Sequence, residues 1–329
     1  MGEKPGWLTL DPTGKYIFST DEVSNFQGKK DTGGVYSGQI DSDGVITAVS
    51  SAKTGSIPAA AQVSPDGRFL LVASYAGAAV DLFKIEKKSE ILSSEPVQTV
   101  HLHGSGPNTQ RQRHAFAHQA VYDKGGRLAF VPDLGADKLR IFEVNDPSGR
   151  LSEVEPVIFP PGTGPRHLVI VENFIYVVCE LSSRIFILKL DRSSQDGHKA
   201  EIIGALGTLP TDANADNFGA GEIAASPDGH FIYATNRPMS TAGPIEDNTF
   251  AVFARSSDDG MLDSPTFYPV GGRTARHFAI SHDTVGRFVV VGAVDSNLVI
   301  IHRRDPMTGA LMQIARTKVK KPSVQIFAI

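Results

Sequence analysis

The chain has 329 residues, of which 41 % are hydrophobic and 21 % are charged, and its formal net charge at pH 7 is −4. This is the composition of a packed globular protein, and the acidic balance without an aromatic–basic patch excludes the usual signature of nucleic-acid binding. No apolar run approaches the ~18 residues that a membrane span needs, so we expect no membrane partner. The single cysteine, Cys179, allows no internal disulfide and suits a cytoplasmic or a secreted protein equally.

A short motif recurs along the chain: an apolar run, a turn of the Pro-Asp-Gly type, a second apolar run and then a polar residue. Its clear copies cover residues 7–21, 61–75 and 222–236, and weaker copies cover residues 118–133, 167–180 and 277–295. The turn glycines recur roughly every 50 to 60 residues, or at about twice that interval; they are Gly14, Gly67, Gly126, Gly229 and Gly286. Such a period with four short strands per repeat predicts the blades of an all-β β-propeller.

Each motif is followed by two further predicted strands. In the first repeat they cover residues 34–40 and 45–49, and in the third they cover residues 138–144 and 151–154. Polar and apolar residues alternate in these segments, as in half-buried antiparallel strands, and no helical periodicity is sustained over three turns. Longer polar inserts are expected to be loops; they cover residues 23–33, 101–117, 193–221 and 238–248.

The strand count gives six four-stranded repeats between Pro5 and about residue 320, and Ser323–Ile329 then reads as the first strand of another blade. Partners for this strand are missing, because only residues 1–4 precede the first repeat. We therefore expect a single domain over residues 1–329, a seven-blade frame that lacks the amino-terminal part of one blade. On this interpretation the chain starts downstream of its natural beginning. A closed propeller needs no second copy, so we expect a monomer.

Polar side chains gather where the first two strands of each repeat begin and end. Because these strands are antiparallel, the start of the first and the end of the second lie at the same edge of the blade. The residues at the starts are Trp7, Ala59, His118, Arg166, His167, Glu222, Arg276 and His277, and those at the ends are Asp21, Glu22, Tyr75, Asp133, Glu180, Asn236, Arg237 and Asp295. The pattern predicts a polar functional pocket. Asp133, with Asp137, flanks a turn and is expected to cap its main chain.

Several segments resemble a known family. Gly164-Pro-Arg-His167, residues 131–137, Cys179-Glu-Leu181 and the segment from Ser226 to Arg237 are similar to those of the seven-bladed β-propeller lactonases. That family includes the propeller-type 6-phosphogluconolactonases and the fungal 3-carboxy-cis,cis-muconate lactonising enzymes, and residues 106–112 resemble its fungal branch. The resemblance covers residues 5–329 and implies a propeller fold and chemistry on a lactone ring.

The resemblance also implies which residues form the pocket. The catalytic positions of the family fall on His118, Glu180, Arg166 and Arg237. Further residues are expected to bind the substrate; they are His167, Glu222, Asn236, Arg276, His277 and Tyr75. Two positions depart from the family, which often has a histidine at Phe116 and, in this branch, an acid at Gln119. We expect no metal and no organic cofactor, since no His, Cys or Asp cluster has zinc-like spacing.

These residues predict how a lactone is opened. Three arginines at one mouth imply an anionic substrate, and Arg166 or Arg237 would stabilise the oxyanion. His118 is the candidate base, because histidine ordinarily titrates near neutrality, and Glu180 would either orient it or simply neutralise Arg166. The predicted reaction is hydrolysis of an anionic sugar lactone of the 6-phosphogluconolactone type. The alternatives are cyclisation of a carboxymuconate and a non-catalytic propeller that binds a partner or a small anion.

Overall fold

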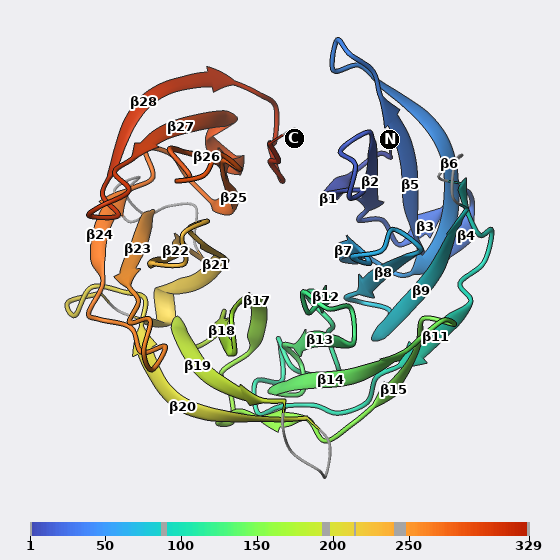
Figure 1. The fold of residues 1–329 in the computed structure, drawn as a ribbon, viewed down its shortest axis with the longest axis horizontal. Coiled ribbons are helices and arrows are strands. Elements are labelled where there is room, and N and C mark those ends of the chain that lie inside the picture. Colours follow the sequence, from blue (N-terminus) through green and yellow to red (C-terminus); the bar gives the residue numbers. More distant parts are fainter. Residues whose placement is uncertain (1, 87–90, 193–197, 214, 240–247, 328–329) are drawn as a thin grey trace. The chain divides into compact units, whose positions relative to one another are not determined.

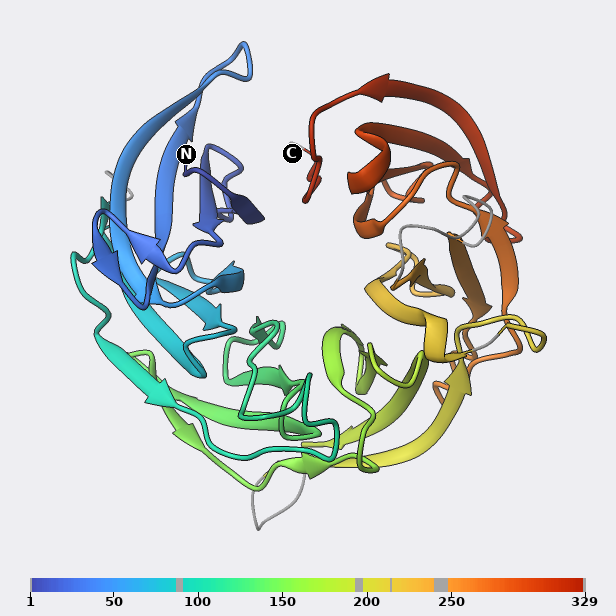
Figure 2. The same cartoon turned by 180° about the vertical axis from the view of Figure 1, so that it is seen from behind.

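The structure is a computed structural model that describes residues 2–86, 91–192, 198–213, 215–239 and 248–327. The chain divides into two compact units, of which the first runs to Gly164 and the second runs from Pro165 to Phe327. Each unit contains three antiparallel sheets, which Figures 1 and 2 show from opposite sides. Besides one two-stranded hairpin, the described part of the chain has six larger sheets, four with four strands and two with five, which confirm the all-β character and the repeated sheets predicted from the sequence.

In the first unit the sheets follow one another along the chain. The first sheet contains β1 (Pro5–Leu10), β2 (Tyr16–Asp21), β5 (Thr32–Ile40) and β6 (Ile46–Gly55), and β3 (Asn25–Phe26) pairs with β4 (Lys29–Lys30) in a separate hairpin. The second contains β7 (Pro58–Val63), β8 (Phe69–Ser74), β9 (Ala79–Glu86), β10 (Ile91–Leu92) and β11 (Gln98–His101). The third contains β12 (Val121–Tyr122), β13 (Leu128–Asp133), β14 (Lys138–Asn145), β15 (Arg150–Glu153) and β16 (Val157–Ile158).

The second unit repeats the same topology, with each strand paired to the next one in its sheet. The fourth sheet contains β17 (Pro165–Val171), β18 (Phe174–Cys179), β19 (Arg184–Asp191) and β20 (Lys199–Gly207). The fifth contains β21 (Phe218–Ala225), β22 (Phe231–Pro238), β23 (Thr249–Ala254) and β24 (Thr266–Pro269). The sixth contains β25 (Ala275–Ile280), β26 (Phe288–Ala293), β27 (Leu298–Arg304) and β28 (Leu311–Lys318). Within this unit the first strands β17, β21 and β25 are neighbours (Figure 1).

The second strand of a sheet is the most buried one. Every residue of β8, β13 and β18 is buried, so the side chains on both faces of each strand are shielded from solvent. Leu71 and Val131, for example, belong to one apolar cluster of the first unit, and Phe250 and Phe278 belong to one of the second. Burial on both faces explains why these strands appear in the sequence as continuous apolar runs.

The recurring turn between the first and second strands is closed by its own side chains. In the turn after β21, Ser226 Oγ donates to Asp228 Oδ1 and also accepts the main-chain N–H of Phe231 at 3.0 Å. The same bonds join Ser64, Asp66 and the N–H of Phe69 in the second sheet. Gly229 and Gly67 both have a φ of 72°, a conformation that disfavours other residues. The Ser-Pro-Asp-Gly sequence therefore fixes the spacing of the strands on either side.

Two predicted loops are wrong. The insert predicted over residues 23–33 contains the hairpin of β3 and β4 and the start of β5. The insert predicted over residues 193–221 contains β20 and the start of β21, while residues 193–197 lie outside the described part of the chain. None of the residues in β20 is buried, because it is an edge strand of its sheet. An edge strand without a buried face shows no alternation in the sequence, which is why the prediction fails here. Most of the insert predicted over residues 238–248 also lies outside the described residues.

The strand predicted over Ser323–Ile329 is also wrong for the residues that the structure describes. Residues 323–327 belong to no strand, and residues 328 and 329 are outside the described part. Instead of pairing with a strand, the main-chain N–H of Gln325 donates to His277 Nδ1 at 3.2 Å. The seven-blade frame, the single domain and the monomer stay predictions. Among the described residues no helix is long and apolar enough to cross a membrane.

Buried histidines make stability depend on pH. His302 in β27 is 1 % exposed, and burial lowers its pKa to about 4, against about 6.5 for a free histidine. Below pH 6.5 the unfolded chain takes up a proton that the folded chain refuses until about pH 4, so this stabilisation is full above pH 6.5 and is lost as the pH falls.

We therefore expect His302→Leu to remove up to about 3 kcal/mol of the stability difference between pH 7 and pH 4. Urea unfolding at the two pH values measures it, with the exposed His230→Leu as the matched control. An identical pH dependence in wild type and His302→Leu would contradict the expected effect.

Candidate active site

A β-bulge lies in the first strand of five of the sheets, and in the third sheet the extra residue lies just before β12. In β17, Pro165 pairs with Cys179 and His167 pairs with Val178, so Arg166 is the extra residue. In β25, Arg276 is extra in the same way. In β21 the residues Gly221 and Glu222 together face one residue of β22. The corresponding residues in the first unit are Gly6, Ala59 and one of residues 118–120. A bulge redirects the side chain of the extra residue, and in the second unit these side chains are charged.

Glu180 lies between two arginines in the second unit. It follows β18 directly, is 1 % exposed, and its Oε2 atom lies 2.6 Å from Nη1 of Arg166 and 2.9 Å from Nη2 of Arg237. Arg166, which is 3 % exposed, also donates through Nε to the carbonyl oxygen of Gly221 at 2.9 Å. The structure thus brings together three of the four residues predicted to be catalytic. Of the two roles considered for Glu180, the observed contacts are those of a counter-ion for both guanidinium groups.

Glu222 has a histidine on each of its carboxylate oxygens. Its Oε1 atom lies 2.8 Å from Nδ1 of His167, and its Oε2 atom lies 3.6 Å from Nε2 of His277. Burial lowers the pKa of His167, and it lowers the pKa of His277 to about 4, so both imidazoles are neutral at pH 7. Burial opposes ionisation of Glu222, but its contacts with His167 and His277 outweigh burial and hold its pKa below the ordinary value. Glu222 is therefore a buried carboxylate that fixes two neutral imidazoles.

The cluster carries an excess of positive charge. Arg276 acts electrostatically on Arg166 and on both histidines, and burial together with Arg276 lowers the pKa of Arg166 although Glu180 raises it. Three arginines (Arg166, Arg237, Arg276) against two carboxylates (Glu180, Glu222) leave a net charge of +1 on these five residues. A gathering of three guanidinium groups favours the binding of an anion.

In the first unit, His118 belongs to a group of aromatic rings. His118 is 7 % exposed and packs edge-on against Tyr75, with ring centroids 5.3 Å apart. Tyr75 in turn stacks on Phe116 at 4.5 Å, and Phe116 packs on His114 at 4.0 Å. Phe116, which departs from the family's usual histidine, therefore serves as a packing surface for Tyr75.

The turn residues and Asn236 have structural contacts. Asp133 accepts the main-chain N–H groups of Phe116, Gly135 and Ala136, as its predicted capping role requires. The side chain of Asn236 accepts from Thr208 Oγ1 at 2.7 Å and donates to the Thr208 carbonyl and to Thr249 Oγ1. The amide of Asn236 is engaged by Thr208, which follows β20 of the fourth sheet, and by Thr249 of its own sheet, so we leave it out of the proposed site. Among the described residues no group of three or more His, Cys, Asp or Glu could hold a metal ion.

Two contacts of the cluster are absent from the sequence prediction. Thr235 Oγ1 accepts the N–H of Glu222 at 3.0 Å and donates to the Ala275 carbonyl at 3.0 Å, which joins β21, β22 and β25. The main-chain N–H of Gln325 donates to Nδ1 of His277. Because Nδ1 is the acceptor, the hydrogen of the neutral imidazole is on Nε2, which faces Glu222. Thr235 comes directly before two predicted site residues, so its place in the sequence could have indicated that it belongs to the cluster. Nothing in the sequence indicates that Gln325 lies beside His277.

The chain matches the family model described as "Lactonase, 7-bladed beta-propeller" over residues 1–327. A 6-phosphogluconolactonase of Formosa agariphila is 30 % identical over 335 residues, which cover 98 % of this chain and 88 % of the relative. A 6-phosphogluconolactonase of Bacillus subtilis is 27 % identical over 95 % of this chain and 84 % of its own length. The solved structure of a periplasmic gluconolactonase of Pseudomonas aeruginosa superposes with a TM-score of 0.83 at 27 % identity, covering 96 % of this chain and 86 % of that one.

Removal of the Glu180 charge is expected to destabilise the fold. In Glu180→Gln the buried guanidinium of Arg166 loses its counter-charge, which should cost about 3–5 kcal/mol of unfolding free energy. The control Glu95→Gln breaks an exposed ion pair with Lys53 and should cost less than about 1 kcal/mol. Guanidinium chloride unfolding measures both variants. An equal loss of unfolding free energy in the two variants would contradict the expected extra cost of removing a buried counter-charge.

Proposed function

Because this chain belongs to the seven-bladed β-propeller lactonase family, we propose that it hydrolyses the ring ester of an anionic sugar lactone. A sugar lactone with a phosphate group, as in 6-phosphogluconolactone, is the substrate class that we favour. Support comes from the Formosa agariphila and Bacillus subtilis relatives, both of which are named 6-phosphogluconolactonase. The residue cluster of the second unit adds a physical reason for an anionic substrate.

The net positive charge of the cluster is the observation that carries the proposal. Arg166 and Arg237 converge on one carboxylate oxygen, Oε2 of Glu180, so two guanidinium groups lie beside each other in the cluster. A guanidinium offers two parallel N–H groups that match a phosphate or a carboxylate. In a site shielded from water such donors also stabilise the negative charge that develops on the carbonyl oxygen of a lactone under attack.

The reaction needs a base that removes a proton from water. The hydroxide formed adds to the lactone carbonyl carbon, the bond from that carbon to the ring oxygen breaks, and the ring oxygen takes up a proton. The products are a carboxylate and a hydroxyl on one open chain. We keep His118 as the proposed base, as the sequence predicts, and we propose that Glu180 positions the two arginines.

His167 is the alternative base. With Nδ1 directed to Glu222, its Nε2 atom is left as the proton acceptor, an arrangement that orients imidazoles in many hydrolases. We rank His167 second because it is 3 % exposed, against 7 % for His118, so a water molecule has less access to it. We therefore propose that His167 and Glu222 shape the wall of the site.

Hydrolysis is favoured over ring closure. Each relative named above is a 6-phosphogluconolactonase or a gluconolactonase, and a cycloisomerase would need the same residues to protonate a double bond. Incubation with a carboxymuconate should therefore give no lactone.

The direct test measures acid release from 6-phosphogluconolactone in a pH-stat, above the spontaneous rate. Wild type should hydrolyse it, and His118→Ala should lower kcat by roughly 10² to 10⁴, the usual contribution of an acid–base group, with an unchanged melting temperature. His167→Gln should lower kcat by less than about tenfold.

His230→Ala, which changes an exposed imidazole in a turn, is the matched control and should keep the wild-type rate. If His118→Ala retains full activity and His167→Gln loses it, the base is His167. If wild type releases no acid from any lactone tested, the proposed function is wrong.

A further inference from the structure

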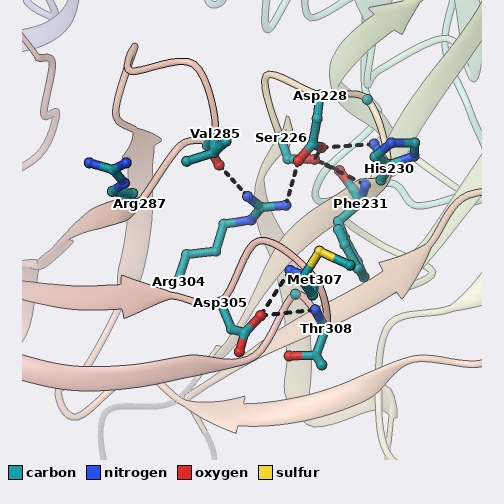
Figure 3. A network of polar contacts seen from close by, with 12 residues as sticks. Ser226, Asp228, His230, Phe231, Val285, Arg287, Arg304, Asp305, Met307 and Thr308 are labelled. Carbon is teal, nitrogen blue, oxygen red and sulfur yellow. Dashed lines mark hydrogen bonds and ion pairs between the residues drawn. The ribbon is translucent and has the colours of Figure 1, made fainter.

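A single arginine side chain is buried at the interface between the fifth and sixth sheets; we call such an interface between consecutive sheets a joint. Arg304, at the end of β27, donates through Nε to the hydroxyl of Tyr233 at 2.7 Å and through Nη1 to the carbonyl oxygen of Val285. Its Nη2 atom lies 3.4 Å from Oδ2 of Asp228, as Figure 3 shows. The guanidinium also lies over the ring of Phe231, 5.3 Å from the centroid. The side chain of Arg304 has no exposed surface, so it fills this joint completely.

Arg255 closes the joint between the fourth and fifth sheets in the same way. It donates to the Tyr176 hydroxyl at 2.8 Å, to the Gly229 carbonyl at 3.2 Å and to Glu172 at 2.6 Å. Its guanidinium lies 5.6 Å from the centroid of the Phe174 ring. Both joints thus combine a hydroxyl, a turn carbonyl, an acid from the preceding sheet and an aromatic ring around one guanidinium.

The joint between the second and third sheets has the same backbone but no such arginine. Its corresponding residue is Val144, whose N–H donates to the Arg127 carbonyl at 2.9 Å, just as the N–H of Arg304 donates to Arg287 at 2.7 Å. Gly149 lies against the ring of Phe69 as Gly309 lies against Phe231. Val144 therefore stands at the position that Arg255 and Arg304 have in the other two joints.

A cavity of about 300 Å³ occupies the place that the arginine side chain fills elsewhere. Its lining includes Asp66, Phe69, Gly125, Arg127 and Val144, in the positions of Asp228, Phe231, Val285, Arg287 and Arg304 in Figure 3. It also includes Gly149, in the position of Gly309. Tyr122 also lines it. Tyr122 is 5 % exposed, and its buried hydroxyl has no hydrogen-bond partner among the described residues. The cavity thus has an acid and an aromatic ring in the positions found in the other joints, whereas Leu71 stands where they have a tyrosine, and the buried hydroxyl here comes from Tyr122 in β12 instead.

Arg68 makes some of the contacts at this joint that Arg255 and Arg304 make at theirs. Its Nε donates to Asp66 at 2.5 Å, its Nη2 donates to Asp146 at 2.7 Å, and its guanidinium lies 5.6 Å from the Phe69 centroid. Its Nη1 donates to the carbonyl oxygen of Pro147 at 3.1 Å, and one third of its side chain is exposed, so Arg68 reaches these groups from the solvent side of the cavity. At the position of Arg68 the other two joints have Asn173 and His230.

We propose that this cavity is a second ligand site, which binds the guanidinium group of a small guanidino compound. The ligand would donate to the Tyr122 hydroxyl, share Asp66 with Arg68 and lie against Phe69, as Arg255 and Arg304 do in their joints. A planar cation fits this set of groups better than an ammonium ion, because the acceptors lie around its edge and the ring lies on its face. The site is independent of the lactone chemistry proposed above.

Calorimetric titration with methylguanidinium at constant ionic strength tests the proposal, with methylamine as a cation of equal charge that lacks the planar group. Wild type should bind methylguanidinium with saturation and methylamine not at all. Asp66→Asn should weaken binding about tenfold, because a hydrogen bond to a charged partner is lost. Arg68→Asn, which introduces the residue of the fourth sheet, should tighten binding about threefold by removing a competing cation.

Val144→Arg should abolish binding, because its own guanidinium fills the cavity, whereas the isosteric Val144→Thr should bind like wild type. Agmatine and a blocked Gly-Arg-Gly peptide separate the two sources of the group: binding of agmatine alone indicates a free metabolite, and binding of both indicates that an arginine of another chain also fits. All these variants should hydrolyse lactone at the wild-type rate.

Binding that is equal for methylguanidinium and methylamine, or that survives unchanged in Val144→Arg and Asp66→Asn, would overturn the proposal. Saturable binding of methylphosphonate in place of methylguanidinium would identify an anion site and overturn it as well.

Discussion

The extra residue at the start of each first strand is the constraint on which the candidate site depends. Two residues must face one there, and a side chain that would otherwise alternate with its neighbours is turned out of register. In β21 this is possible only because Gly221 has no side chain: a Cβ atom would lie 2.6 Å from Thr235 Oγ1 and 2.8 Å from the Ala275 carbonyl. The carbonyl of Gly221 is free to accept from Arg166, and Glu222 follows directly. The position of both ion clusters thus follows from the backbone.

Burial of these charges is costly for the fold. Glu180 and Arg166 are each less than 4 % exposed, and removing two ions from water costs more than a single ion pair returns unless further hydrogen bonds compensate. Here the second guanidinium of Arg237 and the Gly221 carbonyl supply those bonds. Well-packed apolar residues would hold the sheets together at least as well, so stability alone does not account for the cluster. The gathering of three arginines is explained if the site binds a ligand with an anionic group.

Much of the fold and part of the site could be predicted from the sequence. Buried second strands such as β18 appear as apolar runs, and the Ser-Pro-Asp-Gly turns carry the bonds that close them, so local patterns were sufficient. The positions of Glu180 and Arg166 at paired strand ends made their contact predictable. The edge strand β20 was not predicted, because it has no buried face and its sequence shows no apolar alternation. The contact between Gln325 and His277 was not predicted, because it joins segments 48 residues apart and has no local sequence signal. The contacts of Asn236 with Thr208 were missed for the same reason.

The central claim is that the surplus positive charge among Arg166, Arg237 and Arg276 binds the anionic group of a sugar lactone. The most direct measurement compares kcat/KM for 6-phosphogluconolactone and for gluconolactone in wild type and in Arg237→Gln. Wild type should prefer the phosphorylated substrate by about tenfold or more, and the variant, which lacks one charge-assisted bond, should lose most of that preference. Equal rates on both lactones in wild type, or a preference that survives in Arg237→Gln, would contradict the account.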